Sequence, residues 1–329
     1  MTFDKKTMPI DVVLTWVSSD DPVWVKKRDE ALGCASTCLD DNASSNVRWH
    51  DKEELRYALR SLWENAPWVN HIYIVTDAQI PEWLNDQYPK ITIVDHKEIF
   101  PDTNCLPVFN SHAIEACLHN IATLSEHFIY LNDDILISRP VEKSDFYTEG
   151  GECVFYAKHS TKVPDPKAHS AEEVSVYDAA AMTARALIVK ETGYDCDRRV
   201  THAPITLIKS HLHKMESVFN EAIQRTRCAK FRSQGDVPLP SFMYPWYGWT
   251  QGWVEMRTLE RKSDVVGGIP LAKWSFIKKT IKVFVKRPMF LNINDSENGS
   301  VPLWLRKLIV RKVVGRLFPH PAPWERENT

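Results

Sequence analysis

The chain lacks the features that would mark a membrane-spanning or a nucleotide-loop protein. It contains no run of about 18 apolar residues, so we expect no membrane-spanning helix. Its first residues, from Met1 to Val13, have no signal-peptide apolar region. No GxGxxG follows the first predicted strand, and no GxxxxGK followed by Ser or Thr occurs. These absences argue against dinucleotide-binding and P-loop functions.

A strong charge of one sign and a regular cysteine pattern are missing as well. The formal net charge of the 329 residues is -2, so no global field favours nucleic acid as a partner. The seven cysteines are Cys34, Cys38, Cys105, Cys117, Cys153, Cys196 and Cys228. Their odd number and scattered spacing favour reduced thiols in a cytosolic protein over a disulfide framework. Cys34 and Cys38 have no second Cys or His pair close in sequence, so we interpret them as part of a loop.

The order of predicted elements indicates an α/β fold. Apolar, β-rich segments at 10–17, 71–76, 91–94 and 128–131 alternate with helical patterns at 51–65, 81–84 and 111–124. This alternation predicts a doubly wound, mostly parallel sheet. Further segments predict a strand at 153–157, helices at 178–192 and 201–227, and a last strand at 283–293. We expect one domain, with a main half at 10–150, a second half at 151–300 that completes the site, and a basic helix and tail at 301–329.

The stretch from Asn110 to Asp134 carries the clearest chemical signal. Apolar residues at helical spacing, with Ser111 as the expected N-cap, lead into the strand at 128–131, which ends at Asn132, Asp133 and Asp134. Ligands of open α/β sheets bind at the carboxyl ends of strands, and paired carboxylates suit Mg²⁺. A solvated turn explains the segment equally well. Asn294 and Asp295 repeat the pattern after the strand at 283–293.

Basic and imidazole side chains add three further candidates. Arg56 and Arg60, four residues apart on the predicted helix, form either a solvated edge or a clamp for an anionic ligand. His202 precedes Pro204 at a predicted helix start, where free amides attract anions. A capping histidine is the alternative. The stretch 304–318 is basic and amphipathic, typical of a packed terminal helix or of contact with an anionic membrane surface.

Four segments, taken in order, resemble the Stealth family. That family comprises bacterial capsular polysaccharide phosphotransferases and the catalytic subunit of the lysosomal-enzyme N-acetylglucosamine-1-phosphotransferase. The segments are IDVVLTWVSSDDP at Ile10, the block from DKEELRYALRSLWEN at Asp51 to YLNDD ending at Asp134, THAP at Thr201 with Arg232 and Asp236, and FLNINDS at Phe290. The resemblance covers most of residues 10–325, and the second segment is the most specific.

The resemblance implies a Rossmann-like nucleotide-sugar transferase core and a phosphotransferase activity in capsular or surface polysaccharide synthesis. Such an enzyme moves a sugar-1-phosphate from a nucleotide sugar, first of all a UDP-sugar, to a hydroxyl of a glycan acceptor. A phosphodiester forms, a nucleoside monophosphate leaves, and the anomeric bond stays intact. The expected cofactor is Mg²⁺ or Mn²⁺, and the expected location is the cytoplasm, with peripheral contact at the inner face of the cell membrane as a hypothesis.

The resemblance also implies roles for individual residues. His202 would be the general base, Arg232 would stabilise phosphoryl oxygens, and Glu115 would orient the histidine or a sugar hydroxyl. The donor side would be lined by Asp11, Trp16, Arg56, Asn132 and Asp236. The metal ligands would come from Asp133, Asp134, Asn294 and Asp295.

Two other functions stay open. A metal-dependent glycosyltransferase would share the sheet and the acidic strand end, but it would break the anomeric bond and release a nucleoside diphosphate. A non-catalytic glycan-binding scaffold would use the aromatic patch at 242–249. A scaffold gives no reason for two acidic strand ends together with His202.

Overall fold

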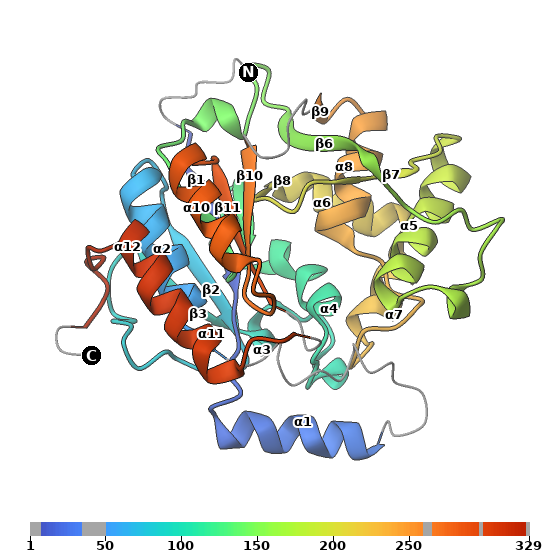
Figure 1. Ribbon diagram of the computed structural model, residues 1–329. Helices are drawn as coiled ribbons and strands as arrows, with labels where there is room; N and C mark the ends of the chain where they lie inside the picture. The colour runs from blue at the N-terminus through green and yellow to red at the C-terminus, as the bar shows by residue number, and fades with distance from the viewer. Residues whose placement is uncertain (1–7, 35–50, 259–264, 296–298, 327–329) are drawn as a thin grey trace.

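A five-stranded, mostly parallel sheet forms the centre of the protein (Figure 1). The computed structural model describes residues 8–34, 51–258, 265–295 and 299–326. In spatial order the strands are β3 Ile91–Asp95, β2 Ile72–Thr76, β1 Ile10–Thr15, β4 His127–Asn132 and β8 Ile205–Ile208. The first four run parallel, and β8 is antiparallel to β4. The predicted doubly wound, mostly parallel sheet is confirmed.

The strand order creates a switch point beside β1. From β1 the chain winds outward through β2 and β3, and it then returns to add β4 on the other side, so Val12 pairs with both Ile72 and Ile129. Apolar runs such as this fit a strand that is buried on both faces. Crevices at the carboxyl ends of strands next to a switch point are where open α/β sheets bind ligands.

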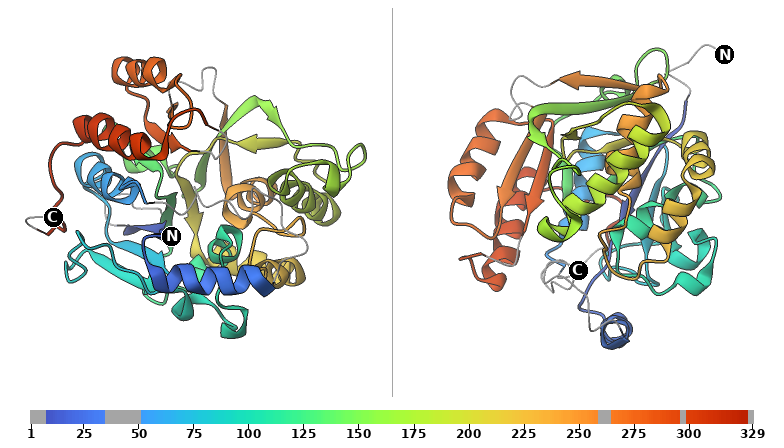
Figure 2. Two further views of the ribbon diagram at one scale, coloured as in Figure 1. Left: turned by 60° about the horizontal axis from the view of Figure 1, so that its bottom comes forward. Right: turned by 90° about the vertical axis from the view of Figure 1, so that its right-hand side faces the viewer.

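Helices cover the sheet on both sides, with α2 on one and α4, α6 and α7 on the other (Figures 1 and 2). Their bounds are α1 Pro22–Cys34, α2 Glu54–Asn65, α3 His96–Ile99, α4 Ser111–Glu115, α6 Lys209–Val218 and α7 Asn220–Arg227. Single 3₁₀ turns are η2 Thr103–Cys105, η3 Leu118–Asn120, η4 Lys143–Asp145 and η5 Ala171–Glu173. The expected buried face of α2, formed by Leu55, Leu59 and Leu62, packs in the main core.

A small second sheet continues directly from the end of β4. It consists of β10 Val266–Pro270, β11 Phe290–Asn294 and β5 Ile135–Ile137. The elements that pack on it are α10 Phe276–Lys286, α11 Leu303–Ile309, the π-helix η7 Val310–Val314 and α12 Gly315–Leu317. β5 follows β4 after a two-residue turn at Asp133 and Asp134. Because β11 pairs with β5, β11 lies close to the end of β4.

A third sheet lies beyond β8. It contains β7 Arg198–Val200, β6 Cys153–Lys162 and β9 Val254–Thr258, with α5 Val176–Thr192, the π-helix η6 Leu239–Met243 and α8 Tyr244–Thr250. The predicted strand at 153–157 and helix at 178–192 are confirmed. Residues of β6, β8 and α8 share the hydrophobic core of the main sheet.

The predicted helix at 111–124 is broken, and Asn110 rather than Ser111 caps it. The side chain of Asn110 accepts a hydrogen bond from the His112 amide, and α4 ends at Glu115. A continuous helix would bond the Ala116 carbonyl to the amide of residue 120. Arg227 instead donates to that carbonyl at 3.2 and 2.9 Å, and the residue 120 amide turns to Cys117.

Four other local predictions are wrong. The segment 201–227 is not one helix, because β8 pairs with β4 before α6 begins. The segment 283–293 is the end of α10 and the start of β11, separated by Pro288. The segment 81–84 forms turns and a bridge instead of a helix. Asp51 accepts from the amide of residue 53, so it lies ahead of α2 and does not cap it.

The expectation of reduced thiols is wrong for one pair. Cys105 and Cys228, 123 residues apart, form a disulfide that ties the loop after β3 to the end of α7. Cys117, Cys153 and Cys196 are free and buried, and burial raises the pKa of each to about 12. The loop predicted for Cys34 and Cys38 is not tested, because the structure does not describe these two side chains. None of the described helices has both the length and the apolarity needed to cross a bilayer.

Arg56 and Arg60 clamp a carboxylate of the protein itself. Arg56 Nε lies 2.6 Å from Glu325 Oε2, and Arg60 donates to both oxygens of Glu325 at 2.6 and 2.8 Å. The Glu325 side chain is only 2% exposed. The pair therefore fastens the C-terminal segment to α2, and Arg56 is not among the residues that line the cavity described below.

We predict that Glu325→Ala lowers the free energy of unfolding by about 3–5 kcal/mol, because it leaves two largely buried guanidinium groups without their carboxylate. Urea unfolding at neutral pH measures this. The matched control is Glu82→Ala, which removes an exposed carboxylate and should change stability by no more than about 0.5 kcal/mol.

The same pair predicts a pH dependence. Burial raises the pKa of Glu325, but hydrogen bonds from Arg60 and Arg56 outweigh it and hold the pKa below the ordinary value of 4.5. A depressed acid stabilises the fold above its unfolded pKa and loses that contribution as the pH falls through its folded pKa. The stability difference between wild type and Glu325→Ala should therefore persist at neutral pH and shrink only below about pH 4.5. Equal stability at neutral pH would contradict this.

Candidate active site

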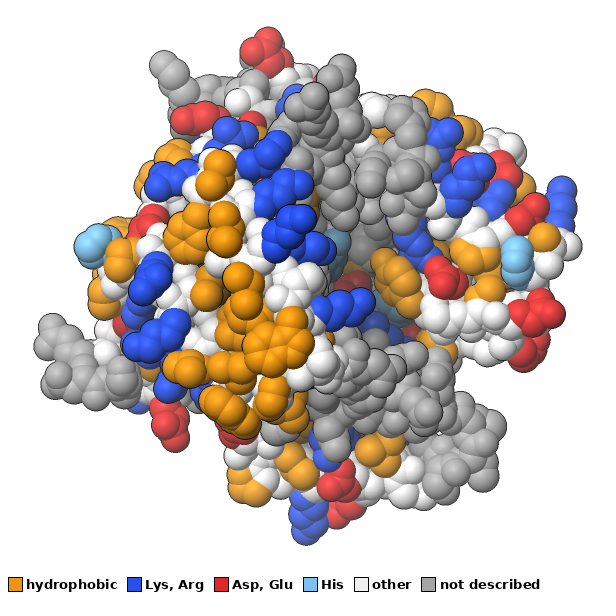
Figure 3. Space-filling view, viewed as in Figure 1, with side chains coloured by type: hydrophobic (Ala, Val, Ile, Leu, Met, Phe, Trp, Pro, Cys, Tyr) orange, Lys and Arg blue, Asp and Glu red, His pale blue; other side chains and the backbone are white. Residues whose placement is uncertain are grey.

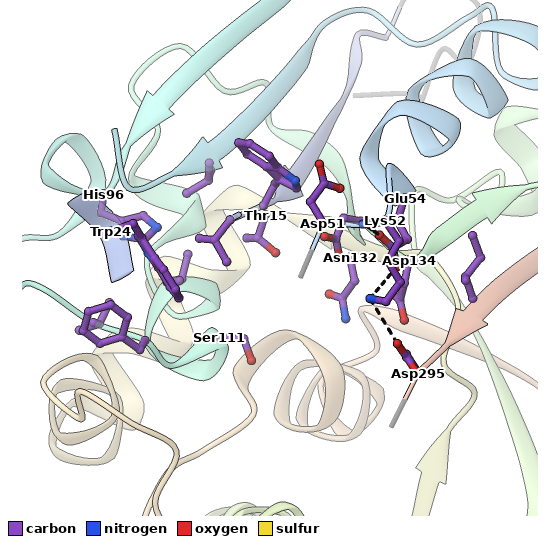
Figure 4. A pocket seen from close by; sticks show the side chains of 18 of the residues that line it. Thr15, Trp24, Asp51, Lys52, Glu54, His96, Ser111, Asn132, Asp134 and Asp295 are labelled. Carbon is purple, nitrogen blue, oxygen red and sulfur yellow. Dashed lines mark hydrogen bonds and ion pairs between the residues drawn. The ribbon is translucent and has the colours of Figure 1, made fainter. Parts of the chain in front are cut away.

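A cavity of about 280 Å³ opens at the carboxyl ends of β1, β2 and β4 (Figure 4). Its walls are Thr15, Trp16, Val17, Trp24, Asp51, Lys52, Glu54, Val75, His96, Val108, Phe109, Ser111, Ile114, Asn132, Asp133, Asp134, Arg232, Ile293 and Asp295. The cavity therefore occupies the switch point, as expected for a ligand site of an open α/β sheet.

Carboxylates dominate one end of the cavity. Asp133 and Asp134 form the turn between β4 and β5, and Asp51 and Glu54 approach from the start of α2 (Figure 4). Desolvation, followed by repulsion from Glu54, Asp134 and Asp51, raises the pKa of Asp133 well above its ordinary value. Desolvation likewise raises the pKa values of Asp51 and Glu54. A group of acids this crowded favours a bound cation.

These residues fit a divalent metal ion. Asp134 Oδ1 is buried and accepts no hydrogen bond from the described residues. Asp133 lies beside it, and Asn132 adds an amide oxygen at the end of β4. Oxygen donors of this kind are the ligands that Mg²⁺ and Mn²⁺ take in proteins.

Lys52 is the cation that the protein itself supplies to this group. Its ammonium lies 3.2 Å from Glu54 Oε1 and 3.3 Å from Asp295 Oδ2, and the residue is 6% exposed. Burial lowers the pKa of Lys52, but the attraction of Glu54 and Asp295 outweighs it and raises the pKa overall. Lys52 therefore stays charged at the cavity wall, where it is able to attract a phosphate group.

The two residues predicted after the last strand differ in their placement. Asp295 reaches the cavity, but its carboxylate is held by Lys52 and by Arg306, whose Nη1 lies 2.5 Å from Oδ1. Asn294 is exposed and does not line the cavity. Asp295 thus anchors Lys52. Asn294 does not share the cavity with the other predicted metal ligands.

Arg232 lies at the opposite wall from these acids. Its guanidinium donates to Ser111 Oγ at 2.6 Å, which fixes it against the start of α4. Asp236, predicted on the donor side, is fully buried and accepts from Asn110 Nδ2 and from the amide and hydroxyl of Ser233. Asp236 is therefore not among the residues that line the cavity. It holds the loop that carries Arg232.

His202 and Glu115 lie beside the acidic turn. His202 Nε2 is 3.8 Å from Asp134 Oδ1, and its side chain is 46% exposed. Glu115 accepts a hydrogen bond from Tyr130 at 3.1 Å, while its Oε2 has no partner within the described structure. Burial raises the pKa of Glu115, although His112, Arg232 and His202 oppose that rise. Because residue 204 precedes a strand, the helix-start argument for His202 is wrong.

The first segment contributes one of its two predicted residues. Trp16 lines the cavity just beyond β1, and its buried Nε1 has no hydrogen-bond partner among the described residues. Asp11 lies at the other end of β1, where it accepts from Asn70 Nδ2 and from the amide of Ser125. Asp11 is therefore not among the residues that line the cavity, since the amino end of a parallel strand is a strand length away from the crevice.

Sequence reasoning missed several residues of the cavity, among them Lys52, Glu54 and Ser111. Their signal was present in DKEE at the start of α2 and in the polar start of α4. It was not decisive, because charged residues are common at helix starts. Only the fold brings these segments to the ends of β1 and β4.

A second group with metal-binding side chains lies outside the cavity. The donor atoms of His119, His213 and Glu216 are within 4.8 Å of one another. Glu216 is already engaged, because hydrogen bonds from His119 and Arg227 lower its pKa to about 2. We assign this group to structure, since Arg227 also holds the carbonyl that ends α4.

Comparison with known proteins identifies two family regions in the chain. Residues 48–155 match Stealth protein conserved region 2, and residues 201–248 match conserved region 3. These two regions contain most of the polar wall of the cavity, from Asp51 to Asp134, as well as His202 and Arg232.

Curated relatives align with nearly the whole chain. An exopolysaccharide phosphotransferase of Streptomyces coelicolor is 42% identical over 323 residues, which are 97% of this chain and 53% of that protein. Exopolysaccharide phosphotransferases of Nocardia farcinica and Mycobacterium leprae are each 34% identical, over 96% and 98% of this chain and 61% and 58% of their own lengths. The chain thus spans a third to about three fifths of the length of such relatives.

Solved structures give a weaker likeness. The galactosyltransferase LgtC, in complex with donor and acceptor sugar analogues, aligns at a TM-score of 0.42 and 13% identity over 96% of this chain and 99% of that one. Mouse xyloside xylosyltransferase 1 aligns at a TM-score of 0.41 and 10% identity, over 87% of this chain and 98% of that one. The family assignment therefore rests on sequence: by its two conserved regions and by its curated relatives, the chain belongs to the Stealth family.

Proposed function

We propose that the protein transfers a sugar-1-phosphate from a nucleotide sugar to a hydroxyl of a glycan acceptor during polysaccharide synthesis. The single observation that carries this proposal is the grouping of Asp133, Asp134, Lys52 and Arg232 around one cavity, with His202 beside Asp134. A cavity lined by acids and by the cations of Lys52 and Arg232 suits a diphosphate bound with a divalent metal ion. The names of the curated relatives support the same reaction class.

The proposed reaction exchanges one bond to phosphorus for another. The acceptor oxygen forms a new bond to the sugar-bearing phosphorus, and the bond from that phosphorus to the oxygen of the nucleoside monophosphate breaks. The proton of the acceptor hydroxyl passes to the half-exposed imidazole of His202, which acceptor chains are able to reach from solvent. Arg232 and Lys52 stabilise negative charge on phosphoryl oxygens.

The remaining residues bind and orient. Asp133 and Asp134, with Asn132, would hold Mg²⁺ or Mn²⁺, which would neutralise the diphosphate. Trp16 would donate its Nε1–H, which has no hydrogen-bond partner among the described residues, to the donor. Ser111 and Asp236 keep Arg232 in position. The UDP-sugar remains our proposal for the donor.

Analysis of the nucleotide product separates this reaction from the glycosyltransferase alternative. With a panel of nucleotide sugars, Mg²⁺ and an oligosaccharide acceptor, we expect a nucleoside monophosphate to accumulate in step with the phosphodiester product. Release of a nucleoside diphosphate would reject the proposal in favour of glycosyl transfer. Glycan binding without any turnover would favour a scaffold.

We predict that turnover needs a divalent cation and that Asp134→Asn raises the cation concentration for half-maximal activity by at least about tenfold. The substitution keeps the size of the side chain but removes charge from the acidic turn. Titration of Mg²⁺ or Mn²⁺ with each purified protein gives this value, and circular dichroism checks that the variant is folded. Full activity of the wild type in excess chelator would disprove the metal requirement.

We predict that His202→Ala lowers turnover by about 10²–10⁴-fold, the usual contribution of a positioned base. Donor binding, measured by calorimetry, should change little, since the arginine and the acidic turn remain. His169→Ala is the matched control, because it removes an exposed histidine outside the cavity. Near-normal turnover of His202→Ala, or a loss of donor binding in proportion to turnover, would refute the role of the base.

A further inference from the structure

Two neighbouring helices on the small sheet expose an unusual number of large apolar side chains. In α10, only Val283 is buried. Val285 is 78% exposed and Trp304, at the start of α11, is 72% exposed. Both helices pack on the same cluster around β11, and Figures 1 and 2 show them next to each other. Their outer faces therefore form one surface.

We call this the α10–α11 surface and define it by its exposed apolar side chains. These are Trp274, Ile277, Ile281, Phe284, Val285, Leu303, Trp304 and Leu308. In the space-filling view, hydrophobic side chains gather over α10 and α11 with Lys and Arg beside them (Figure 3). Isolated apolar residues are normal on a protein surface, but a contiguous group of this kind marks an interaction site.

The charge of the surface is of one sign. Neither 265–294 nor 299–318 contains an Asp or Glu. Exposed lysines of α10 (Lys278, Lys279, Lys282 and Lys286) and Lys312 of η7 flank the apolar residues. Long lysine side chains at such positions extend toward anionic headgroups while their stems cover apolar surface.

The structure changes which helix is the better candidate for membrane contact. The sequence predicted membrane contact for 304–318 alone. In that stretch Arg306 is buried against Asp295, and Arg311 is paired with Glu53. The helix α10, which was predicted to be partly a strand, supplies exposed lysines on the outer side of the sheet.

We propose that the α10–α11 surface binds an anionic phospholipid bilayer, with its tryptophans and branched side chains in the interfacial region and its lysines among the headgroups. An amphipathic face with Trp and Ile on one side and Lys on the other is typical of helices that lie in a membrane interface. A second copy of the chain is a poorer occupant, because a two-fold contact would set the same lysines against each other.

The surface is connected to the candidate active site. Arg306 of α11 holds Asp295, which in turn holds Lys52 at the cavity wall. This part of the inference rests on the proposed function: a bilayer bound here would keep a membrane-attached glycan acceptor near the cavity. Membrane binding itself does not require catalysis, so the two proposals are tested separately.

The test is co-sedimentation of the purified chain with vesicles of phosphatidylcholine, with and without phosphatidylglycerol, in the absence of nucleotide sugar. We expect binding to the anionic vesicles, weaker binding in high salt, and little binding to phosphatidylcholine alone. Ile281→Glu with Val285→Glu should lower the partition coefficient by at least about tenfold. Lys279→Gln with Lys282→Gln should lower it by about fivefold for each charge removed.

Val23→Glu is the control for a new surface carboxylate, since it changes an exposed valine of α1 on another face. It should sediment like the wild type. All four substituted side chains are exposed, so circular dichroism should be unchanged, and nucleotide release with a soluble acceptor should be unchanged. The proposal is overturned if the wild type stays in the supernatant, if the α10 variants bind as it does, or if the wild type is a dimer that these variants dissociate.

Discussion

Mutual repulsion among the carboxylates at the ends of β4 and α2 is the constraint on which the rest of the site depends. Asp133, Asp134, Asp51 and Glu54 come together because β4 pairs with β1 at the switch point and α2 starts beside them. Burial and proximity raise the pKa of Asp133. Such a group is stable only with positive charge close by. Lys52 supplies part of it, and Asp134 Oδ1, which accepts no hydrogen bond from the described residues, is where a metal ion would supply more.

The cationic residues are held in place by contacts far from the cavity. Asp295 and Arg306 connect Lys52 to α11, and Asp236 with Asn110 fixes the loop that carries Arg232. Segments distant in sequence therefore converge on one cavity. Substitutions at Asp236 or Arg306 would act through the position of Arg232 or Lys52, although neither residue lines the cavity.

The sequence predicted the parts of this arrangement that depend on local pattern. Apolar runs revealed β1, β2, β3 and β4, and the acidic turn after β4 could be assigned to a strand end. Contacts between distant segments were not predictable in this way. Asp11 and Asp236 were assigned to the donor site because they belong to segments that resemble the Stealth family. Whether such a residue faces the cavity depends on strand pairing and on loop contacts with distant parts of the chain. Arg56 was expected to meet a ligand, and the anion it meets is Glu325, 269 residues later.

Predictions of helix or strand were wrong where tertiary contacts override local propensity. The helix that follows Asn110 ends early because Arg227 takes its carbonyl, and the segment after His202 becomes β8 because β4 has a free edge for it. The disulfide between Cys105 and Cys228 was also not predictable from local sequence, since no spacing rule links residues that far apart. The α10–α11 surface was only partly visible in the sequence, because the last four of the eleven residues of α10 were predicted to be a strand.

The central claim is that the bond to phosphorus breaks and the anomeric bond does not. A nucleotide sugar with oxygen-18 between the anomeric carbon and the phosphorus tests this directly. After turnover with an acceptor glycan, mass spectrometry of both products locates the label. Cleavage at phosphorus predicts that all of it stays with the sugar-1-phosphate in the new phosphodiester. Label in the released nucleotide would show cleavage at the anomeric carbon and would contradict the proposed reaction.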